Sequence, residues 1–374
     1  MLHSDGATGA VVLLRIGLVP LTGSNLDRRD FLSAAGGVAF LCTVGGKQVS
    51  VRTAADVKEV DEAAAAIERP AAAKRDPLDS ARFGTPEPQP GGRVREYWVS
   101  ARTVRWNVAP TGRDEWMQKR LPRPRTFTAL VYQRFSAGFA RAIGPARMPG
   151  PTLRAEVGDV LVVHFRNPGG KIRQALTMHP HGVRYTPDYD GSYLGDFTRA
   201  GGFVAPGEEF TYVWEATADS VGAWPYHDHG PNHTLNTFRG LFGTLIVRAK
   251  GAPVPDVERV LYLHSLSPQV TGIPQLVHCV NGRTAAGNTP TIRARVGQSV
   301  AIHVMGGDSN FHTFHIHGHR WRDSGGAFVD TPTVGPNETI TAAFREDNPG
   351  RWLYHCHVFS HQDAGMAGWY LVDP

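Results

Sequence analysis

The chain has 374 residues, of which 41% are hydrophobic and 20% are charged, a composition typical of folded globular domains. The formal net charge of +5 is modest, and part of it comes from an arginine-rich N-terminal region, so we infer no nucleic-acid partner. The chain is unusual in having 17 histidines but only three cysteines, which permit at most one disulfide.

Residues 1–54 carry the features of an export signal. Paired arginines at 28–29 precede a short apolar run, rich in alanine and glycine, over residues 33–44. This pattern is typical of a twin-arginine signal, and the run is too short for a transmembrane anchor. We therefore predict export to the periplasm or the cell exterior with no stable membrane anchor, and cleavage near Ala54 or Ala55.

Residues 55–93 are rich in alanine, proline and charged residues, and they end in a stretch with alternating prolines at 86–92. Large apolar side chains are too few there to build a core. We predict that this segment is a linker and that the folded part follows a disordered or cleaved extension. Cys42 is expected to leave with the signal.

From residue 94 onward, short runs of β-branched and aromatic residues are separated by glycine and proline, as at 126–132 and 160–165. This spacing favours an all-β sandwich or barrel, and no long helical periodicity competes with it.

An internal repeat divides this region. The octapeptide at 151–158 recurs at 290–297, and each copy is followed by a His-x-His-Gly and then a Tyr-His-x-His motif. Motifs in the same order predict two homologous β domains, 94–250 and 251–374. The motifs are His179-Pro180-His181-Gly182 and Tyr226-His227-Asp228-His229 in the first copy, and His315-Ile316-His317-Gly318 and Tyr354-His355-Cys356-His357 in the second.

The densest cluster surrounds Cys356, which lies between His355 and His357 and is followed by His361 and Met366. Imidazoles, a thiolate and a weak thioether are the ligands of a blue-copper site. In a strand the two flanking histidines point to the face opposite the cysteine, so this segment can bind a metal on each face. The alternative is a buried free cysteine in a histidine-rich strand.

The first copy lacks this ligand set. Only His361 has a histidine counterpart, His233, whereas Asp228 replaces Cys356, Phe238 replaces Met366 and Leu176 replaces His312. The first domain is therefore expected to keep the paired histidines without a blue copper, with His233 as a relic or a neighbour of a ligand.

The four clusters together resemble the four copper signatures of multicopper oxidases, and two domains with the cysteine only in the second resemble the small two-domain laccases of bacteria. The resemblance covers residues 94–374 and implies two cupredoxin-like Greek-key β-sandwich domains. It implies four coppers: one type 1, one type 2 and a type 3 pair. The implied ligands are His312, Cys356, His361 and Met366 for type 1; His179 and His315 for type 2; and His181, His227, His229, His317, His355 and His357 for type 3.

The resemblance also implies the reaction. Phenolic or aromatic amine donors would lose single electrons at the type 1 copper, and the electrons would pass through Cys356 to His355 and His357, where dioxygen is reduced to water. Two-domain relatives join the histidines of neighbouring chains, so the resemblance implies a homotrimer with interfacial trinuclear clusters. A methionine axial ligand would favour easily oxidised donors.

Two further residues, Tyr185 and Asp228, each have two candidate roles. Tyr185 matches a tyrosine that small laccases carry near the cluster, where it supplies an electron; the alternative is a packing role. Asp228 is either a hydrogen-bonding partner of a ligand or a solvent-facing residue, and Asp188, Asp190 and Asp228 are candidate proton donors. We expect no ligand role for the remaining residues of these types, which are His164, His264, His278, His303, His319 and the core cysteine Cys279.

Three other functions remain to be weighed. A metallo-oxidase acting on Cu(I) or Fe(II) is possible, but the chain has only six methionines and no methionine-rich segment to dock Cu(I). A copper nitrite reductase would carry the cysteine in the first domain. A non-enzymatic copper-binding or electron-transfer cupredoxin needs one blue site and has no use for the paired histidines.

Overall fold

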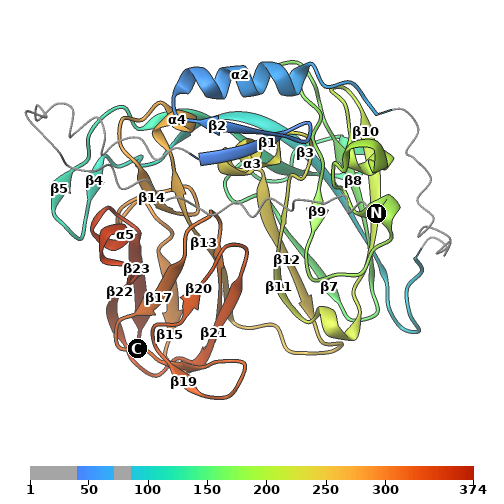
Figure 1. Cartoon of the computed structure of the whole chain (residues 1–374). Helices are drawn as coiled ribbons and strands as arrows, with labels where there is room; N and C mark the ends of the chain where they lie inside the picture. The colour runs from blue at the N-terminus through green and yellow to red at the C-terminus, as the bar shows by residue number, and fades with distance from the viewer. Residues whose placement is uncertain (1–39, 71–85) are drawn as a thin grey trace, which may run out of the picture. The chain divides into compact units, whose positions relative to one another are not determined.

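The computed structural model describes residues 40–70 and 86–374, and most of the regular structure there is β-strand (Figure 1). In the first half of the chain, two four-stranded sheets enclose a core that includes Val99, Leu161 and Leu245. One sheet has the order β10 (Glu209–Glu215), β8 (Val160–Arg166), β3 (Val94–Asn107) and β6 (Thr126–Phe135), and the other has the order β7 (Thr152–Glu156), β12 (Phe242–Arg248), β11 (Gly222–His227) and β9 (His179–Pro180).

The second half repeats this arrangement around a core that includes Leu261, Phe314 and Tyr354. Each main sheet of both halves contains one parallel pair among antiparallel neighbours. The sheets have the orders β14 (Val277–Val280), β13 (Val257–Leu266), β16 (Ser299–Gly306), β21 (Thr339–Arg345), and β15 (Ile292–Arg295), β23 (Ala367–Asp373), β22 (Gly350–Cys356), β17 (His312–Ile316), β20 (Thr333–Val334). The predicted fold class, two cupredoxin-like β-sandwiches, is confirmed.

The alternation of buried and exposed residues along the strands explains which face of each sheet meets a core. In β15 buried and exposed residues alternate, because successive side chains of a strand point to opposite faces and only one face meets the core. A third core lies at the junction of the sandwiches and includes Phe242 and Ile246 of β12 with Tyr262 and Met305 of the second half. Cys279 is fully buried in this junction core, as predicted for a core cysteine.

The remaining elements are short, and several carry site residues. They are the strand pairs β4 (Arg113–Asp114) with β5 (Lys119–Arg120) and β18 (Trp321–Arg322) with β19 (Phe328–Val329), the helices α3 (His233–Phe238), α4 (Pro268–Thr271) and α5 (Phe359–Asp363), and the 3₁₀ turns Ala137–Phe139, Pro187–Tyr189, Gly195–Phe197, Ala200–Gly202 and Ala218–Ser220.

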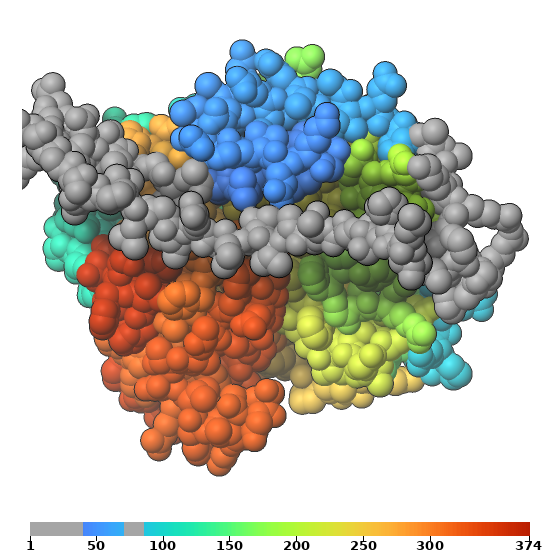
Figure 2. Space-filling view, viewed as in Figure 1, coloured from blue at the N-terminus to red at the C-terminus, as the bar shows by residue number. Residues whose placement is uncertain are grey.

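The N-terminal region differs from the prediction. Residues 40–51 form a hairpin of β1 (Phe40–Val44) and β2 (Lys47–Val51), and α2 (Ala54–Ala65) follows where a linker was predicted. Figure 1 shows α2 lying across this hairpin, and Figure 2 shows the same blue segment as a continuous mass on the molecular surface. The linker prediction is wrong for 55–65, where the chain is helical, whereas the export signal and its cleavage site stay predictions. The paired arginines at 28–29 lie outside the described residues.

Helix α2 forms because its first turn is capped and one of its faces is buried. Thr53 caps its first turn in a capping box with Asp56, which satisfies backbone N–H groups. Val57 and Val60 are buried, together with Cys42 of β1, in a small core. Cys42 is therefore part of the folded body, and cleavage near Ala54 would remove one side of this core.

Candidate metal centre

Three of the predicted type 1 residues converge at one end of the second sandwich. Cys356 ends β22, His312 begins β17 and His361 lies in α5. The Cys356 Sγ atom is 3.9 Å from His312 Nδ1 and 3.7 Å from His361 Nδ1. Met366 is fully buried, and its backbone carbonyl accepts a hydrogen bond of 3.0 Å from the Cys356 N–H. The backbone thus ties the methionine to the cysteine.

The electrostatics of this cluster favour a thiolate. Burial raises the pKa of Cys356, but hydrogen bonds with His312 and His361 outweigh burial and lower the pKa to about 6. Burial lowers the pKa of His312, yet hydrogen bonds with Asp308 and Cys356 raise it to about 9. A buried thiolate between imidazoles is a donor set that fits a soft cation such as copper.

Asp308 is a site residue that the sequence analysis missed. Its Oδ1 lies 3.1 Å from His312 Nε2, the ring nitrogen that faces away from Cys356. The carboxylate accepts backbone N–H groups of Ser265 at 2.6 Å and Asn310 at 2.8 Å. It therefore orients the His312 ring, as carboxylates do beside metal ligands. The only sequence signal is its position four residues before His312.

His278 was also missed as a site residue. Its ring stacks on that of His361, with centroids 4.4 Å apart and an interplanar angle of 23°. Ser265 Oγ lies 2.9 Å from His278 Nδ1 and holds the ring in place. Strand β14 brings His278 beside α5 from a distant part of the chain, a contact that the sequence analysis did not predict.

The first domain gathers a second set of histidines. The ring nitrogens of His179, His181 and His227 lie within 4.8 Å of one another, and the two Nε2 atoms of His181 and His227 are 3.1 Å apart. The ring of His229 is 5.2 Å from that of His179 between centroids. Two imidazole nitrogens facing each other this closely leave room for a cation that both can bind.

The second domain repeats the arrangement. The ring nitrogens of His315, His317 and His355 lie within 4.8 Å of one another, with 3.2 Å between Nε2 of His317 and Nε2 of His355. The ring of His357 is 5.3 Å from that of His355 between centroids.

Backbone carbonyls fix the tautomer of four of these histidine rings. In each case Nδ1 lies 2.7–2.9 Å from a carbonyl oxygen, which only accepts, so Nδ1 carries the proton and Nε2 keeps its lone pair. The pairs are His179 with Asp190, His227 with Asp228, His315 with Asp330, and His355 with Cys356. The same carbonyl positions serve both domains.

Burial keeps four of the histidine rings in the two sets neutral. Burial, together with the neighbouring histidines, lowers the pKa of His181, His229 and His355 to about 4 and that of His227 to about 3. At neutral pH their lone pairs are available to a metal. His229 Nδ1 is buried with no hydrogen-bond partner among the described residues, which also fits a missing cation.

The two histidine sets remain apart within the chain. Among the described residues, the ring contacts and hydrogen bonds of His179, His181, His227 and His229 join them to one another, and those of the second-domain histidines do the same, but no such contact crosses between the sets. Each set alone is half of the predicted trinuclear constellation.

Asp228 does not face solvent. It is fully buried, and its carboxylate accepts the backbone N–H of Thr177 at 2.8 Å and Asn236 Nδ2–H at 2.9 Å. Burial raises its pKa to about 6, although these hydrogen bonds lower it. Of the two predicted alternatives, the solvent-facing one is wrong, and Asp228 contacts the ligand His227 through its own carbonyl.

Tyr185 lies beside the first set, with its ring 5.8 Å from that of His179. Burial, together with the neighbouring Asp190 carboxylate, raises the pKa of Tyr185 to about 12. The Asp190 carboxylate also lies 3.3 Å from His179 Nδ1, whereas the side chain of Asp188 is 74% exposed. Tyr185 and Asp190 therefore form one unit with His179, and Asp188 does not.

Two histidines outside the signatures contact ligands. His233 stacks on His229 at 4.6 Å between ring centroids. His319 Nδ1 lies 2.8 Å from the carbonyl oxygen of His317, and its Nε2 is 3.0 Å from the buried Glu346 carboxylate. Of the others, His164 and His303 have hydrogen bonds with threonine hydroxyls in their sheets.

Comparison with known proteins gives this geometry a context. Sequence models described as "Multicopper oxidase" match residues 144–252 and 255–374. The chain is 31% identical over 244 residues to a probable nitrite reductase-hydroxylamine oxidoreductase fusion protein of Kuenenia stuttgartiensis, covering 60% of this chain and 28% of that protein. It is 27% identical over 350 residues to mouse ferroxidase HEPHL1, covering 75% of this chain and 29% of that protein. The chain thus spans less than a third of the length of these relatives.

Solved structures give the same relationship as the sequence comparisons. A crystal structure of a multicopper oxidase superposes with a TM-score of 0.60 at 25% identity, covering 77% of this chain and 92% of that one. Among the described helices, none has the length and apolar character needed to span a membrane. Matched in both sandwiches and carrying the thiolate site and both histidine sets, the chain belongs to the multicopper oxidase family.

Proposed function

We propose that the chain is a laccase-like oxidase that couples one-electron oxidation of phenolic or aromatic amine donors to the reduction of dioxygen to water. One observation carries this proposal. Cys356 of the thiolate cluster is joined by single peptide bonds to His355 and His357 of the second histidine set. A donor site and an oxygen site are thereby connected through the covalent backbone.

In this proposal, His312, Cys356, His361 and Met366 hold a type 1 copper. His179 and His315 hold a type 2 copper, and His181, His227, His229, His317, His355 and His357 hold a type 3 pair. The four coppers would supply one-electron exchange and dioxygen binding. The chain contributes imidazoles whose tautomers are fixed by backbone carbonyls, and a buried, stabilised thiolate.

The histidine sets require a second chain. Each set presents half of the ligands, and the two halves make no contact within the described part of one chain. We infer a homotrimer in which each first-domain set meets the second-domain set of a neighbour, since a closed ring completes every such site. Light scattering is expected to give three chains per particle, and a fully active, copper-replete monomer would rule this out.

The surface around the thiolate cluster favours aromatic donors. Phe311, next to His312, is 60% exposed, and Phe359, at the start of α5, is 69% exposed. Exposed aromatic rings beside the ligands suit a ring-bearing donor better than a hydrated metal ion.

A metallo-oxidase is the second candidate, favoured by the ferroxidase HEPHL1 match across 75% of the chain. A competition between a methoxyphenol and Fe(II) as electron donors separates the two. We expect a higher kcat/KM for the phenol, whereas a preference for Fe(II) would establish the alternative.

The decisive experiment is copper analysis with visible and EPR spectra of copper-loaded protein. We expect about four coppers per chain, with a thiolate-to-copper charge-transfer band and a separate type 2 EPR signal. One copper per chain with the blue band alone would instead support an electron-transfer cupredoxin.

Export by a twin-arginine signal to the periplasm or cell exterior remains part of the proposal, and localisation of the tagged full-length chain tests it.

A further inference from the structure

The N-terminal hairpin and α2 pack directly on the segment that follows His229. Phe40 of β1 contacts Phe238 of α3, with ring centroids 5.3 Å apart, and Leu235 of α3 is fully buried in the core formed by the hairpin and α2. Figure 1 shows α3 beneath β1, between this N-terminal segment and the first sandwich. Helix α3 is therefore held between them.

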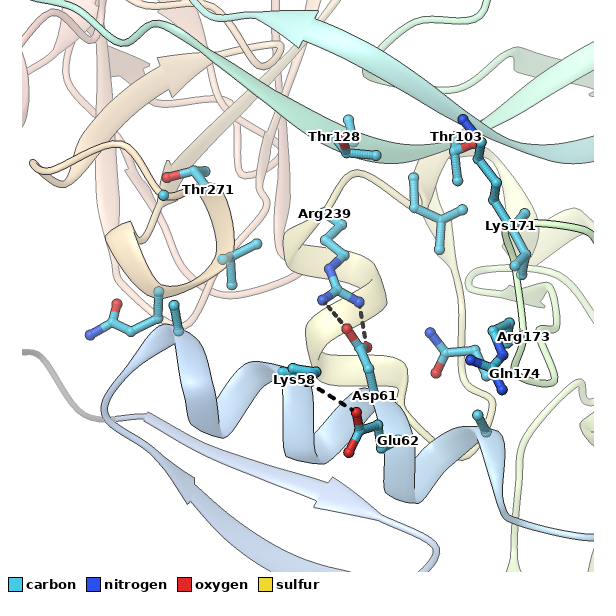
Figure 3. Close-up of a pocket in the computed structure, with 18 of the residues that line it drawn as sticks. Lys58, Asp61, Glu62, Thr103, Thr128, Lys171, Arg173, Gln174, Arg239 and Thr271 are labelled. Carbon is cyan, nitrogen blue, oxygen red and sulfur yellow. Dashed lines mark hydrogen bonds and ion pairs between the residues drawn. The ribbon is translucent and has the colours of Figure 1, made fainter.

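Asp61 of α2 contacts both ends of α3. Its two carboxylate oxygens accept hydrogen bonds from Arg239, the C-cap residue of α3, at 2.7 and 2.6 Å (Figure 3). Asn232, the N-cap residue, donates from Nδ2 to the same carboxylate at 3.3 Å. A two-pronged guanidinium–carboxylate pair fixes orientation as well as distance. The pair borders a cavity of about 880 Å³ beside α2.

From Asn232, buried amides lead to the histidine set. Asn232 donates to Gln174 at 2.9 Å, Gln174 donates to Asn236 at 3.0 Å, and Asn236 donates to Asp228 at 2.9 Å. Asp228 lies between His227 and His229 in the sequence. The series therefore runs without a break from Asp61 on α2 to the segment that carries two predicted type 3 ligands.

The second domain explains why such a series is needed. There, the residues equivalent to Asp228 and His233 are Cys356 and His361, and a metal bound by both would fasten α5 to β22. The first domain has no thiolate at this place. Its α3 is fastened by the Asn236–Asp228 hydrogen bond to the residue that follows β11, and it is held from outside by α2.

We propose that β1, β2 and α2 form a positioning element for the first-domain half of the trinuclear site, and that Asp61 is its key residue. This inference rests on the proposed function. Asp61 touches neither substrate nor metal; it acts through α3 and the amide series on His227 and His229.

The test compares copper-loaded Asp61→Ala with wild-type protein after the wild type has been shown to hold all four coppers. Because Asp61 acts through a neighbour of the ligands, we expect roughly 10–100-fold weaker copper binding at the type 2 and type 3 sites. The blue band should keep its intensity per chain. In stopped flow, bleaching of this band by donor should be unchanged, and its return with dioxygen should slow.

Glu62→Ala is the matched control. Glu62 is on the same helix, and its side chain forms an exposed ion pair with Lys58 at 3.5 Å. This control should behave as wild type, and Asp61→Glu should recover part of the cluster copper. Equal loss of blue copper and cluster copper in Asp61→Ala, or no loss of either, would overturn the proposal. If Asp61→Ala does not fold, Asp61→Asn decides by the same criteria. A wild type with a single copper would instead overturn the proposed function.

Discussion

At the scale of single residues, the sites are built by atoms that orient the ligands. Backbone carbonyls accept hydrogen bonds from Nδ1–H of His227 and His355 and so keep the proton on that nitrogen, and the Asp308 carboxylate does the same for Nε2–H of His312. A motif search finds the ligands but not these partners. A carbonyl carries no sequence signature, and Asp308 is recognisable only once β13 supplies the Ser265 N–H that anchors it.

Asp308→Asn should weaken the type 1 site selectively. The amide lacks the negative charge that makes His312 more basic, so we expect roughly 10–100-fold weaker copper binding there and a higher reduction potential. Copper titration against a competing chelator, followed at the blue band, measures the affinity, and redox titration of the same band measures the potential. The exposed Asp363→Asn is the control, and an unchanged potential in Asp308→Asn would contradict this role.

Tyr185→Phe should remove a radical signal. The Asp190 carboxylate is close enough to raise the pKa of the phenol and can take its proton when an electron leaves, and the phenol ring is 5.8 Å from the ring of His179. Freeze-quenched EPR of reduced protein mixed with dioxygen should show a tyrosyl radical in wild type and none in the variant, which should also release more peroxide. If both proteins give the same spectra and peroxide, Tyr185 has only a packing role.

At the scale of elements, the N-terminal hairpin and α2 belong to the folded body. Val51 and Cys42 are almost completely buried against α2 and α3. If the chain is exported and processed, cleavage must therefore lie before Phe40. Intact mass measurement of exported protein should give a mature chain that still contains β1, and a mature start at Ala54 or Ala55 would contradict this.

At the scale of the molecule, an ion network joins the two sandwiches. Glu258 on β13 accepts hydrogen bonds from Arg154 at 2.9 Å and from Arg248, both on first-domain strands, and lies 3.5 Å from His303. Burial raises the pKa of Glu258, but the neighbouring His303, Arg154 and Arg248 outweigh burial and lower the pKa to about 2.

This network predicts acid lability. Because the pKa of Glu258 is lower in the folded state than its ordinary 4.5, its contribution is complete above pH 4.5 and is lost as pH falls toward 2. The pKa difference corresponds to roughly 3 kcal/mol. Denaturant unfolding of copper-free protein should show stability falling over this range, and Glu258→Gln should be less stable at pH 7 with a flatter pH dependence. Equal slopes for both proteins would contradict the assignment.

The sequence by itself determined the repeat and the all-β class, and it predicted which histidines, cysteine and methionine are metal ligands. Metal ligands and strand alternation are encoded in short spacings, such as the position of Cys356 between His355 and His357, and these survive without knowledge of the fold.

Only the tertiary structure decided the rest. It brought His278 onto His361, joined Asp61 to Arg239, kept the two histidine sets apart and turned an alanine-rich stretch into α2. Composition indicated a linker there because alanine, lysine and glutamate bury little surface alone. The helix is stable because its narrow apolar face is buried in a core shared with β1, β2 and distant residues such as Leu235 and Val270, and contacts between distant segments leave no local pattern to read.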